Sequence, residues 1–214
     1  MRSSFILCLI PITTLLAHVP TLPKTAFMGA QSPINLKEII TKPDPEEPAT
    51  LQLAKMRTDG QNGDVDAQSQ LGNIYYFGEG VPVDWHEAQG WFRKAAERGR
   101  PEAQTKLGVM YFMGQGIPRD IPESVKWFRQ AAAQGETSAQ VCIGAMYAQG
   151  VGVSQDLVEA YTWFLQALAG GNASAVKSCL VIEKLLTPRQ IQEGHRRAAE
   201  AIRMRGKAQI MAGD

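Results

Sequence analysis

The chain has 214 residues, of which 44% are hydrophobic and 20% are charged, and its formal net charge is +1 at pH 7. This composition is typical of one folded unit of ordinary size, and the net charge gives no electrostatic reason to expect binding to nucleic acid or to an acidic partner. The three histidines lie without the spacing of metal ligands, so we expect neither a metal site nor a cofactor. They are His18, His86 and His195.

The first residues have the pattern of an export signal. Arg2 precedes a short apolar stretch at residues 5–17, whereas a helix that spans a bilayer needs about 20 apolar residues. A positive flank followed by a short apolar core is typical of a signal peptide that is removed after export. We therefore expect residues 1–17 to be cleaved after Ala17, or after Ala30 instead, and the mature protein to be periplasmic or secreted without a membrane span.

Residues 18–48 form a proline-rich segment that contains half of the 12 prolines of the chain. We interpret this segment as an extended linker and not as a domain. Residues 49–63 follow it with a helical apolar pattern. We expect them to form a half-repeat helix that caps the N-terminal end of the units described next. Its apolar positions are Leu51, Leu53, Ala54 and Met56.

Residues 64–171 contain one pattern three times at a constant interval of 36 residues. A Trp-Phe pair lies near the end of each unit, a glycine closes it, and alanine, glycine, tyrosine and aspartate recur between these anchors. A constant period of this length is typical of stacked repeat proteins, which bind other molecules more often than they transform them. The tryptophans are Trp91, Trp127 and Trp163, and the closing glycines are Gly99, Gly135 and Gly171.

Each unit has the pattern of two helices joined by a turn. In the first unit, small and apolar residues recur at helical spacing, and Gly78 and Gly80 then end the helix. Asp84 precedes the second helix as an N-cap, with Glu87 three residues later as its reciprocal partner. The inner face of the second helix carries Trp91, which fills the space between neighbouring helices. One such hairpin cannot bury its apolar face alone, but three or more stacked hairpins can.

Residues 172–214 have the pattern of C-terminal capping helices. A first helix is predicted for residues 172–186. Thr187 and Gln190 then form a capping box, with Pro188 at the first helical position. The last helix is polar and rich in arginine, as the end of a solenoid in water requires.

The pattern of one unit resembles that of the Sel-one-like repeat (SLR) family, which is related to the tetratricopeptide repeats. The unit reads Ala-x3-Leu-Gly-x2-Tyr-x2-Gly-x-Gly-Val-x2-Asp-x3-Ala-x2-Trp-Phe-x2-Ala-Ala-x2-Gly, and residues 64–99 match almost every position. The second unit departs from it at Ile117 and Ser124, and the third at Ile143 and Leu168, with little change in packing volume. The resemblance covers about half of the chain. It implies an all-α solenoid of stacked helix hairpins, with three full repeats and capping helices at both ends.

The family resemblance also implies a function. Members act as non-catalytic modules for protein–protein interaction, and roles such as assembling envelope or secretion machinery, regulating a membrane sensor or engaging a host protein are expected of an exported member. We therefore expect a protein partner that binds as a peptide or a helix in a concave groove lined by the first helices.

Removing the packing positions of the repeat leaves a set of first-helix side chains as candidates for contact with this partner. Four of them, Tyr76, Phe77, Phe112 and Met113, are large and apolar although packing does not require it. Either a partner, the linker or a neighbouring second helix would cover them. The candidate groove residues are Asn73, Tyr76, Phe77, Val109, Phe112, Met113, Ala145 and Gln149. Further positions on the same face are Asp66, Ser69, Glu102, Thr105, Ser138, Val141 and Ala148.

Trp85 is predicted to belong to the core instead. Its equivalents in the other two units are the apolar residues Ile121 and Leu157. A position that is apolar in every unit is expected to pack inside the stack.

Two cysteines, Cys142 and Cys179, remain after removal of the signal peptide. They lie on equivalent first helices of adjacent units, whose axes we expect to be about 8–10 Å apart. A disulfide needs Cα atoms within about 4.4–6.8 Å, so we predict that none forms between them. Cys179 also occupies the core position of Leu71 and Leu107.

The alternative function is that of an envelope glycan-binding protein or a peptidoglycan- or penicillin-interacting enzyme. Ser174 and Lys177 match the Ser-x-x-Lys pattern of serine acyl-transfer enzymes, but the partner motifs Ser-Asp-Asn and Lys-Thr-Gly are absent. The concave positions offer only two acids, Asp66 and Glu102, which lie one repeat apart. Clustered acids would favour catalysis, and we therefore expect no enzymatic activity.

Overall fold

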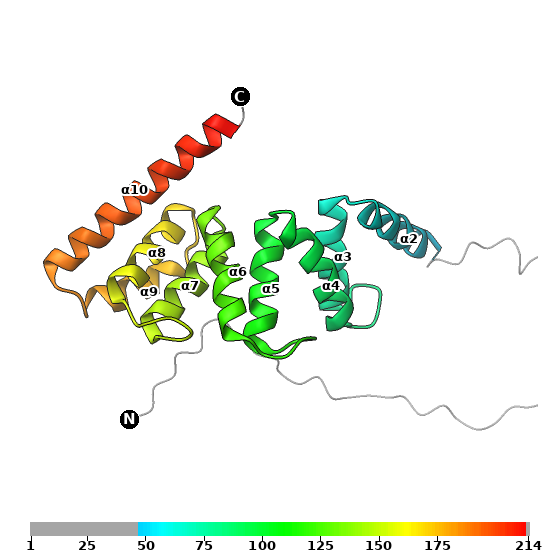
Figure 1. Cartoon of the computed structure of the whole chain (residues 1–214), viewed down its shortest axis with the longest axis horizontal. Coiled ribbons are helices and arrows are strands. Elements are labelled where there is room, and N and C mark those ends of the chain that lie inside the picture. The colour runs from blue at the N-terminus through cyan, green and yellow to red at the C-terminus, as the bar shows by residue number, and fades with distance from the viewer. Residues whose placement is uncertain (1–46, 213–214) are drawn as a thin grey trace, which may run out of the picture. The chain divides into compact units, whose positions relative to one another are not determined.

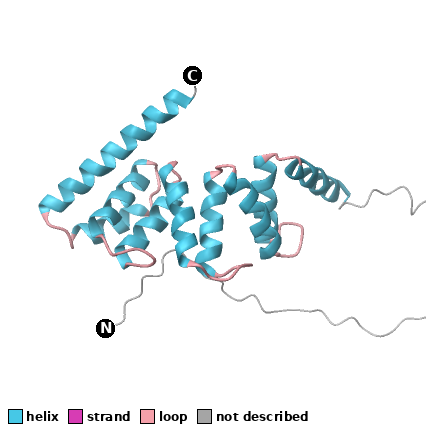
Figure 2. Cartoon of the chain, viewed as in Figure 1, coloured by secondary structure: helices cyan, strands magenta, loops and turns pink. Residues whose placement is uncertain are grey.

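The computed structural model describes residues 47–212, and within this range the regular elements are all helices (Figures 1 and 2). The predicted signal peptide, and all of the predicted linker except its last two residues, lie outside the described residues. The helices in chain order are α2 (Glu47–Gln61), α3 (Val65–Phe77), α4 (Trp85–Glu97), α5 (Pro101–Met113), α6 (Ile121–Ala133), α7 (Thr137–Gln149), α8 (Leu157–Ala169), α9 (Ala175–Glu183) and α10 (Pro188–Ala212).

Three helix hairpins form the centre of the described unit. They are α3–α4, α5–α6 and α7–α8, and the second helix of each hairpin packs on the first helix of the next (Figure 1). This arrangement confirms the predicted all-α solenoid with a 36-residue period.

A glycine in each first helix lets the second helix of the same hairpin approach closely. A Cβ atom added to Gly72 would lie 2.5 Å from the ring of Phe92, which is fully buried. Gly108 and Gly144 receive the corresponding phenylalanine rings in the next two hairpins. In the fourth unit this position is Leu180, which leaves no space for such a ring.

The aspartate N-caps are confirmed, but the reciprocal half of the predicted capping box is wrong. The side chain of Asp84 accepts hydrogen bonds from the backbone N–H groups of His86 and Glu87. The backbone N–H of Asp84 donates to the carbonyl of Tyr75 at 2.9 Å, and not to the side chain of Glu87. The loop folds back on the end of the first helix, where a carbonyl without a partner inside the helix accepts this hydrogen bond.

Two hydrogen-bond series join successive units. A buried glutamine in each first helix donates its amide to a carbonyl at the end of the preceding second helix. These bonds run from Gln68 to Gly60 (2.8 Å), from Gln104 to Ala96 (3.0 Å) and from Gln140 to Ala132 (3.1 Å). Guanidinium groups likewise donate to the hydroxyl of a tyrosine in the next unit, from Arg57 to Tyr75, from Arg93 to Tyr111 and from Arg129 to Tyr147. Because α2 takes part in both series, it caps the stack as the second helix of a preceding unit.

The long helix α10 closes the other end by packing on α8 rather than forming a hairpin with α9 (Figure 1). Thr187 and Gln190 form the predicted capping box at its start, with bonds of 2.9 and 3.4 Å. Further along α10, Arg205 donates to the side chain of Gln166 at 2.6 Å and to the carbonyl of Ala133 at 3.2 Å. These contacts fix α10 against the second helices of two repeats.

A polar cluster connects the last three helices. The buried hydroxyl of Tyr161 in α8 donates to Glu183 in α9, and it lies 3.2 Å from Nε2 of His195 in α10. Burial, followed by the nearby Glu183 carboxylate, raises the pKa of the Tyr161 hydroxyl, which therefore remains protonated at neutral pH. Glu183 occupies the position at which the other units carry the tyrosine that accepts a hydrogen bond from an arginine. In the terminal unit, the hydrogen bond from Tyr161 to Glu183 takes the place of that arginine–tyrosine bond.

No disulfide joins Cys142 and Cys179, as predicted from helix spacing. Cys179 is buried at the predicted core position. Burial, followed by the Glu183 carboxylate, raises the pKa of its thiol to about 11, so the thiol remains protonated at neutral pH.

The prediction for Trp85 is wrong, because 43% of this residue is exposed. Trp85 is the first residue of α4, and its backbone carbonyl lies against Gly116 of the next unit. The backbone is therefore held in the stack while much of the indole ring remains in solvent.

None of the helices between residues 47 and 212 is long and apolar enough to cross a bilayer.

Candidate protein-binding surface

The predicted groove residues all lie on the first helices α3, α5 and α7, and together they are called the first-helix surface here. They are Asn73, Tyr76, Phe77, Val109, Phe112, Met113, Ala145 and Gln149. Phe77 is 54% exposed and Met113 is 41% exposed. Gln149 is also exposed, whereas the other five residues are half-buried.

Tyr76 links the first two repeats and is only partly available to a partner. Its hydroxyl donates to Oε1 of Gln115 at 2.9 Å, and its ring lies edge-on to Phe92 with 6.2 Å between centroids. Burial raises the pKa of the hydroxyl, and the hydrogen bond to Gln115 partly offsets this effect. The rings of Phe77 and Tyr76 pack edge to face with 5.0 Å between their centroids, and more than half of Phe77 remains exposed. Phe77 is therefore the open aromatic side chain of this surface.

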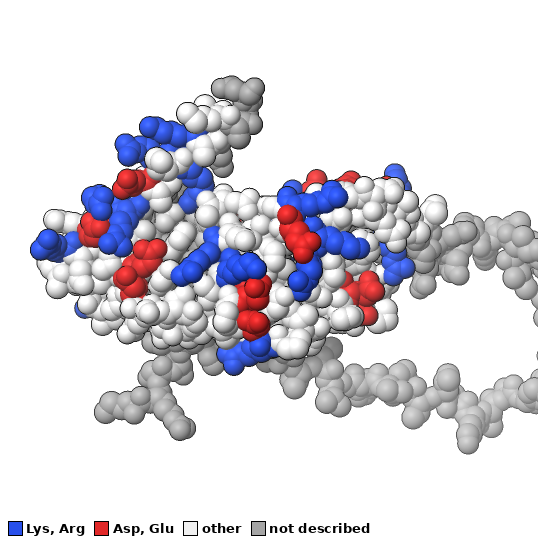
Figure 3. All heavy atoms as spheres, in the orientation of Figure 1, with Lys and Arg blue, Asp and Glu red and all other residues white. Residues whose placement is uncertain are grey.

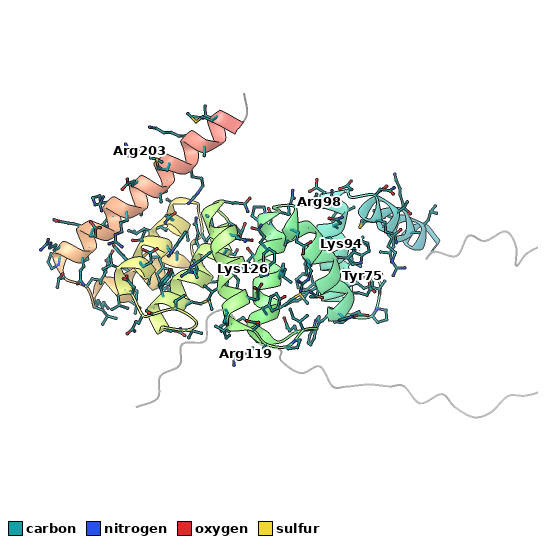
Figure 4. All side chains as sticks on the ribbon, viewed as in Figure 1. Tyr75, Lys94, Arg98, Arg119, Lys126 and Arg203 are labelled. Carbon is teal, nitrogen blue, oxygen red and sulfur yellow. The ribbon has the colours of Figure 1, made fainter. Side chains whose placement is uncertain are left out.

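Two cations lie over these aromatic rings. The ammonium group of Lys106 in α5 is 5.2 Å from the ring centroid of Tyr76 and 4.7 Å from that of Phe77. The guanidinium of Arg119 is 5.7 Å from the centroid of Phe112, and its Nε donates to the carbonyl of Phe112 at 3.0 Å. Arg119 extends from the loop between α5 and α6 (Figure 4).

Sequence reasoning missed both cations because they do not recur. The positions equivalent to Lys106 hold Gln70 and Cys142, and those equivalent to Arg119 hold Val83 and Gln155. Subtracting the repeat pattern marks such positions as variable, but it does not show which of them meet an aromatic ring.

The remaining candidates divide into packed and exposed residues. Val109 and Phe112 pack against the core of the second and third repeats, and Ala145 packs against the core of the last units. Ser69 and Thr105, which the repeat pattern marked as further candidates on this face, are both buried, and the hydroxyl of Thr105 donates to the carbonyl of Pro101 at 2.9 Å.

The two acids of this face form a compact ion-pair group. Arg100 contacts the carboxylate of Asp66 at 2.8 Å and that of Glu102 at 2.9 Å. One guanidinium is therefore shared by both acids.

The apolar surface continues into α9 and the residues after it. Val181 and Leu185 are the equivalents of Asn73 and Phe77 in the fourth unit, and they are 40% and 63% exposed. The 36-residue register, which placed Cys179 at the core position of Leu71, could also have identified these two residues.

The second helices and α10 carry charges of both signs. On the face seen in Figure 3, basic and acidic side chains lie next to one another. On α10, ion pairs with Arg196 and Arg197 lower the pKa of Glu193 to about 2. The basic side chains nevertheless outnumber the acidic ones on α10, which carries six Arg or Lys residues and two Glu residues.

The Ser-x-x-Lys pattern spans the start of α9, with Ser174 at the N-cap and Lys177 in the first turn of the helix. The hydroxyl of Ser174 lies 2.6 Å from Oδ1 of Asn172 and donates to it, and the side chains of Ser174 and Lys177 are both exposed. Between residues 47 and 212, no group of three or more His, Cys, Asp or Glu side chains is arranged to hold a metal ion.

Comparison with known proteins agrees with this architecture. The family model described as Sel1 repeat matches residues 65–99, 101–136 and 137–172. A search of curated proteins found no match. Among solved structures, a Sel1 repeat protein from Oxalobacter formigenes is 39% identical, with 60% of this chain and 97% of that chain covered and a TM-score of 0.56. A protective antigen of uropathogenic Escherichia coli strains, which displays an SLR fold, is 27% identical, with 78% and 43% covered and a TM-score of 0.55.

The chain belongs to the Sel1 repeat family, as its three matched units show and as the sequence pattern predicted. Sel1 repeat proteins are generally non-catalytic modules that mediate protein–protein interactions.

Proposed function

We propose that this protein is an adaptor that holds a segment of another protein on its first-helix surface. The observation that carries the proposal is the exposure of Phe77 and Met113 at equivalent positions of adjacent repeats, beside half-buried aromatic side chains. Large apolar side chains that the core does not need are typical of surfaces that bind a peptide or a helix. Aromatic side chains of this kind supply much of the binding energy in protein interfaces.

The test replaces Phe77 by alanine and measures binding to a partner recovered by cross-linking and affinity purification with the parent protein. Removal of an aromatic hot spot costs about 2–4 kcal/mol of binding free energy, so we expect an affinity roughly thirty- to a thousand-fold lower. Calorimetric titration gives the affinity, and a thermal melt shows that the variant is folded. Trp85→Ala is the matched control, because it removes an exposed aromatic side chain from a second helix. Unchanged affinity of both Phe77→Ala and Met113→Ala would place the partner elsewhere.

We also propose that the protein acts in the cell envelope or outside the cell. Support comes from the sequence alone, through Arg2 and the short apolar stretch that follows it. Mass spectrometry of the protein recovered from the producing cell should find an N-terminus at His18, or at Gln31 if cleavage follows Ala30. Intact Met1 in the cytoplasmic fraction would contradict export.

A further inference from the structure

The two cations that lie over the aromatic rings of the first-helix surface, Lys106 and Arg119, have no acidic partner among the described residues. Between residues 47 and 212, neither Lys106 nor Arg119 forms an ion pair, whereas Arg100, Arg196 and Arg197 each contact at least one carboxylate. Glu79, the acidic residue nearest to Phe77 in the sequence, pairs with neither cation. Lys106 and Arg119 are therefore two positive groups that lie over aromatic rings of this surface and that no carboxylate of the described residues contacts.

Lys106 is also partly withdrawn from solvent. It is half-buried, and this burial lowers the pKa of its ammonium group. A charged group in such a position has lost part of its hydration, and the rings of Tyr76 and Phe77 replace only part of it. A carboxylate from outside the chain would replace the remainder through a charge-assisted hydrogen bond.

The same geometry argues against a basic partner. Aromatic faces attract cations, but the faces of Tyr76 and Phe77 already have Lys106 above them, and that of Phe112 has Arg119. A second cation brought to these rings would be repelled by the first. The two acids on the face are both paired with Arg100.

We propose that the partner segment is an acidic, apolar peptide, with an Asp or Glu side chain that pairs with Lys106 and an apolar side chain that packs on Phe77. This inference rests on the proposed function, because it specifies the chemistry of the segment that the first-helix surface holds. Arg119 adds a second positive group beside Phe112 and favours a further acid in the same segment.

The experiment selects peptides from a random displayed library on the folded full-length protein and measures the affinity of the selected peptides by fluorescence anisotropy. We expect Asp and Glu to be enriched next to large apolar residues. Lys106→Gln should bind these peptides roughly ten- to a hundred-fold more weakly, as expected for loss of a hydrogen bond between charged groups. Lys106→Arg should retain most of the affinity, and a rise in salt concentration should weaken binding to the parent.

Lys94→Gln is the matched control. Lys94 also lies over an aromatic ring, at 4.0 Å from Trp91, but it is exposed on the second helix α4 (Figure 4). This variant should bind the peptides as the parent does. If Lys106→Gln does not fold, replacing each Glu of a selected peptide by Gln and titrating the parent measures the same ion pair from the other side.

The outcomes separate this inference from the proposed function. Peptides that require Phe77 but are neutral or basic, and that bind Lys106→Gln as well as the parent, would overturn the acidic preference and leave the adaptor function standing. A selection that yields no Phe77-dependent peptide would contradict both. Lys106-dependent binding of phosphatidylglycerol vesicles, without Phe77-dependent peptides, would replace the acidic peptide by an anionic lipid surface.

Discussion

Replacing Trp91 by alanine is expected to lower the free energy of unfolding by about 3–5 kcal/mol. Trp91 is only 6% exposed, and it shares a core with Phe92 and with Trp127 of the next repeat. Removal of the indole ring would leave a cavity that spans two repeats, because the buried neighbours are held by their own helices and cannot collapse into it. Urea denaturation followed by circular dichroism measures the loss.

Two variants in the same helix make this prediction specific. Trp85→Ala removes a ring that is largely in solvent, so its cost should be below about 1 kcal/mol. Trp91→Phe keeps an aromatic ring in the cavity and removes an indole N–H that has no hydrogen-bond partner, so its cost should lie between the other two. Equal stability of Trp85→Ala and Trp91→Ala would mean that the core does not depend on the repeated tryptophan.

Gly116→Ala is expected to destabilise the protein by about 2–5 kcal/mol, through two separate costs. Gly116 has a φ of 69°, and an L-residue in this left-handed region costs about 1–2 kcal/mol. A Cβ atom at this position would also lie 2.4 Å from the backbone carbonyl of Trp85 in the preceding repeat. Backbone cannot move aside as a side chain can, so we add about 1–3 kcal/mol for overpacking.

Gly80→Ala separates these two costs. Gly80 occupies the same position in the first repeat with a φ of 72°, but a Cβ atom there would meet nothing within 4 Å. Its loss of stability should therefore reflect the backbone conformation alone. Chemical denaturation measures the free energy of unfolding of both variants, and the difference between their losses is the cost of the contact between repeats. Equal losses would show that the turn at Gly116 is not packed tightly against the preceding repeat.

Most of the fold follows from residues that recur. Gly72 and Phe92 predict the close approach of two helices, because both recur with the 36-residue period. A glycine on one helix leaves space for a large ring from the other. The glutamine and arginine series also recur, and they could have been predicted from Gln68 and Arg57 by the same comparison. The capping role of α2 follows from the same register, since Gly60 stands where the later units carry an alanine.

Features that occur once could not be predicted in this way. Trp85 was assigned to the core from its apolar equivalents, but an indole at the start of a second helix is too large to be covered to the same extent as the side chain of Ile121. The cation above Phe77 depends on the distance between two helices, which the spacing of residues along the chain does not give. The return of α10 to α8 depends in the same way on tertiary contacts, such as the hydrogen bond from Arg205 to Gln166.

The place of Leu180 bears on how the length of such a molecule can change. A unit duplicated after Gly135 would find Ala132 ready to accept its buried glutamine, and it would in turn offer the same carbonyl to Gln140. A unit added after α9 would meet a leucine where a ring must enter, and it would have to displace α10. The stack can therefore be lengthened by inserting whole units of 36 residues between existing repeats, whereas a unit inserted after α9 would not pack in the same way.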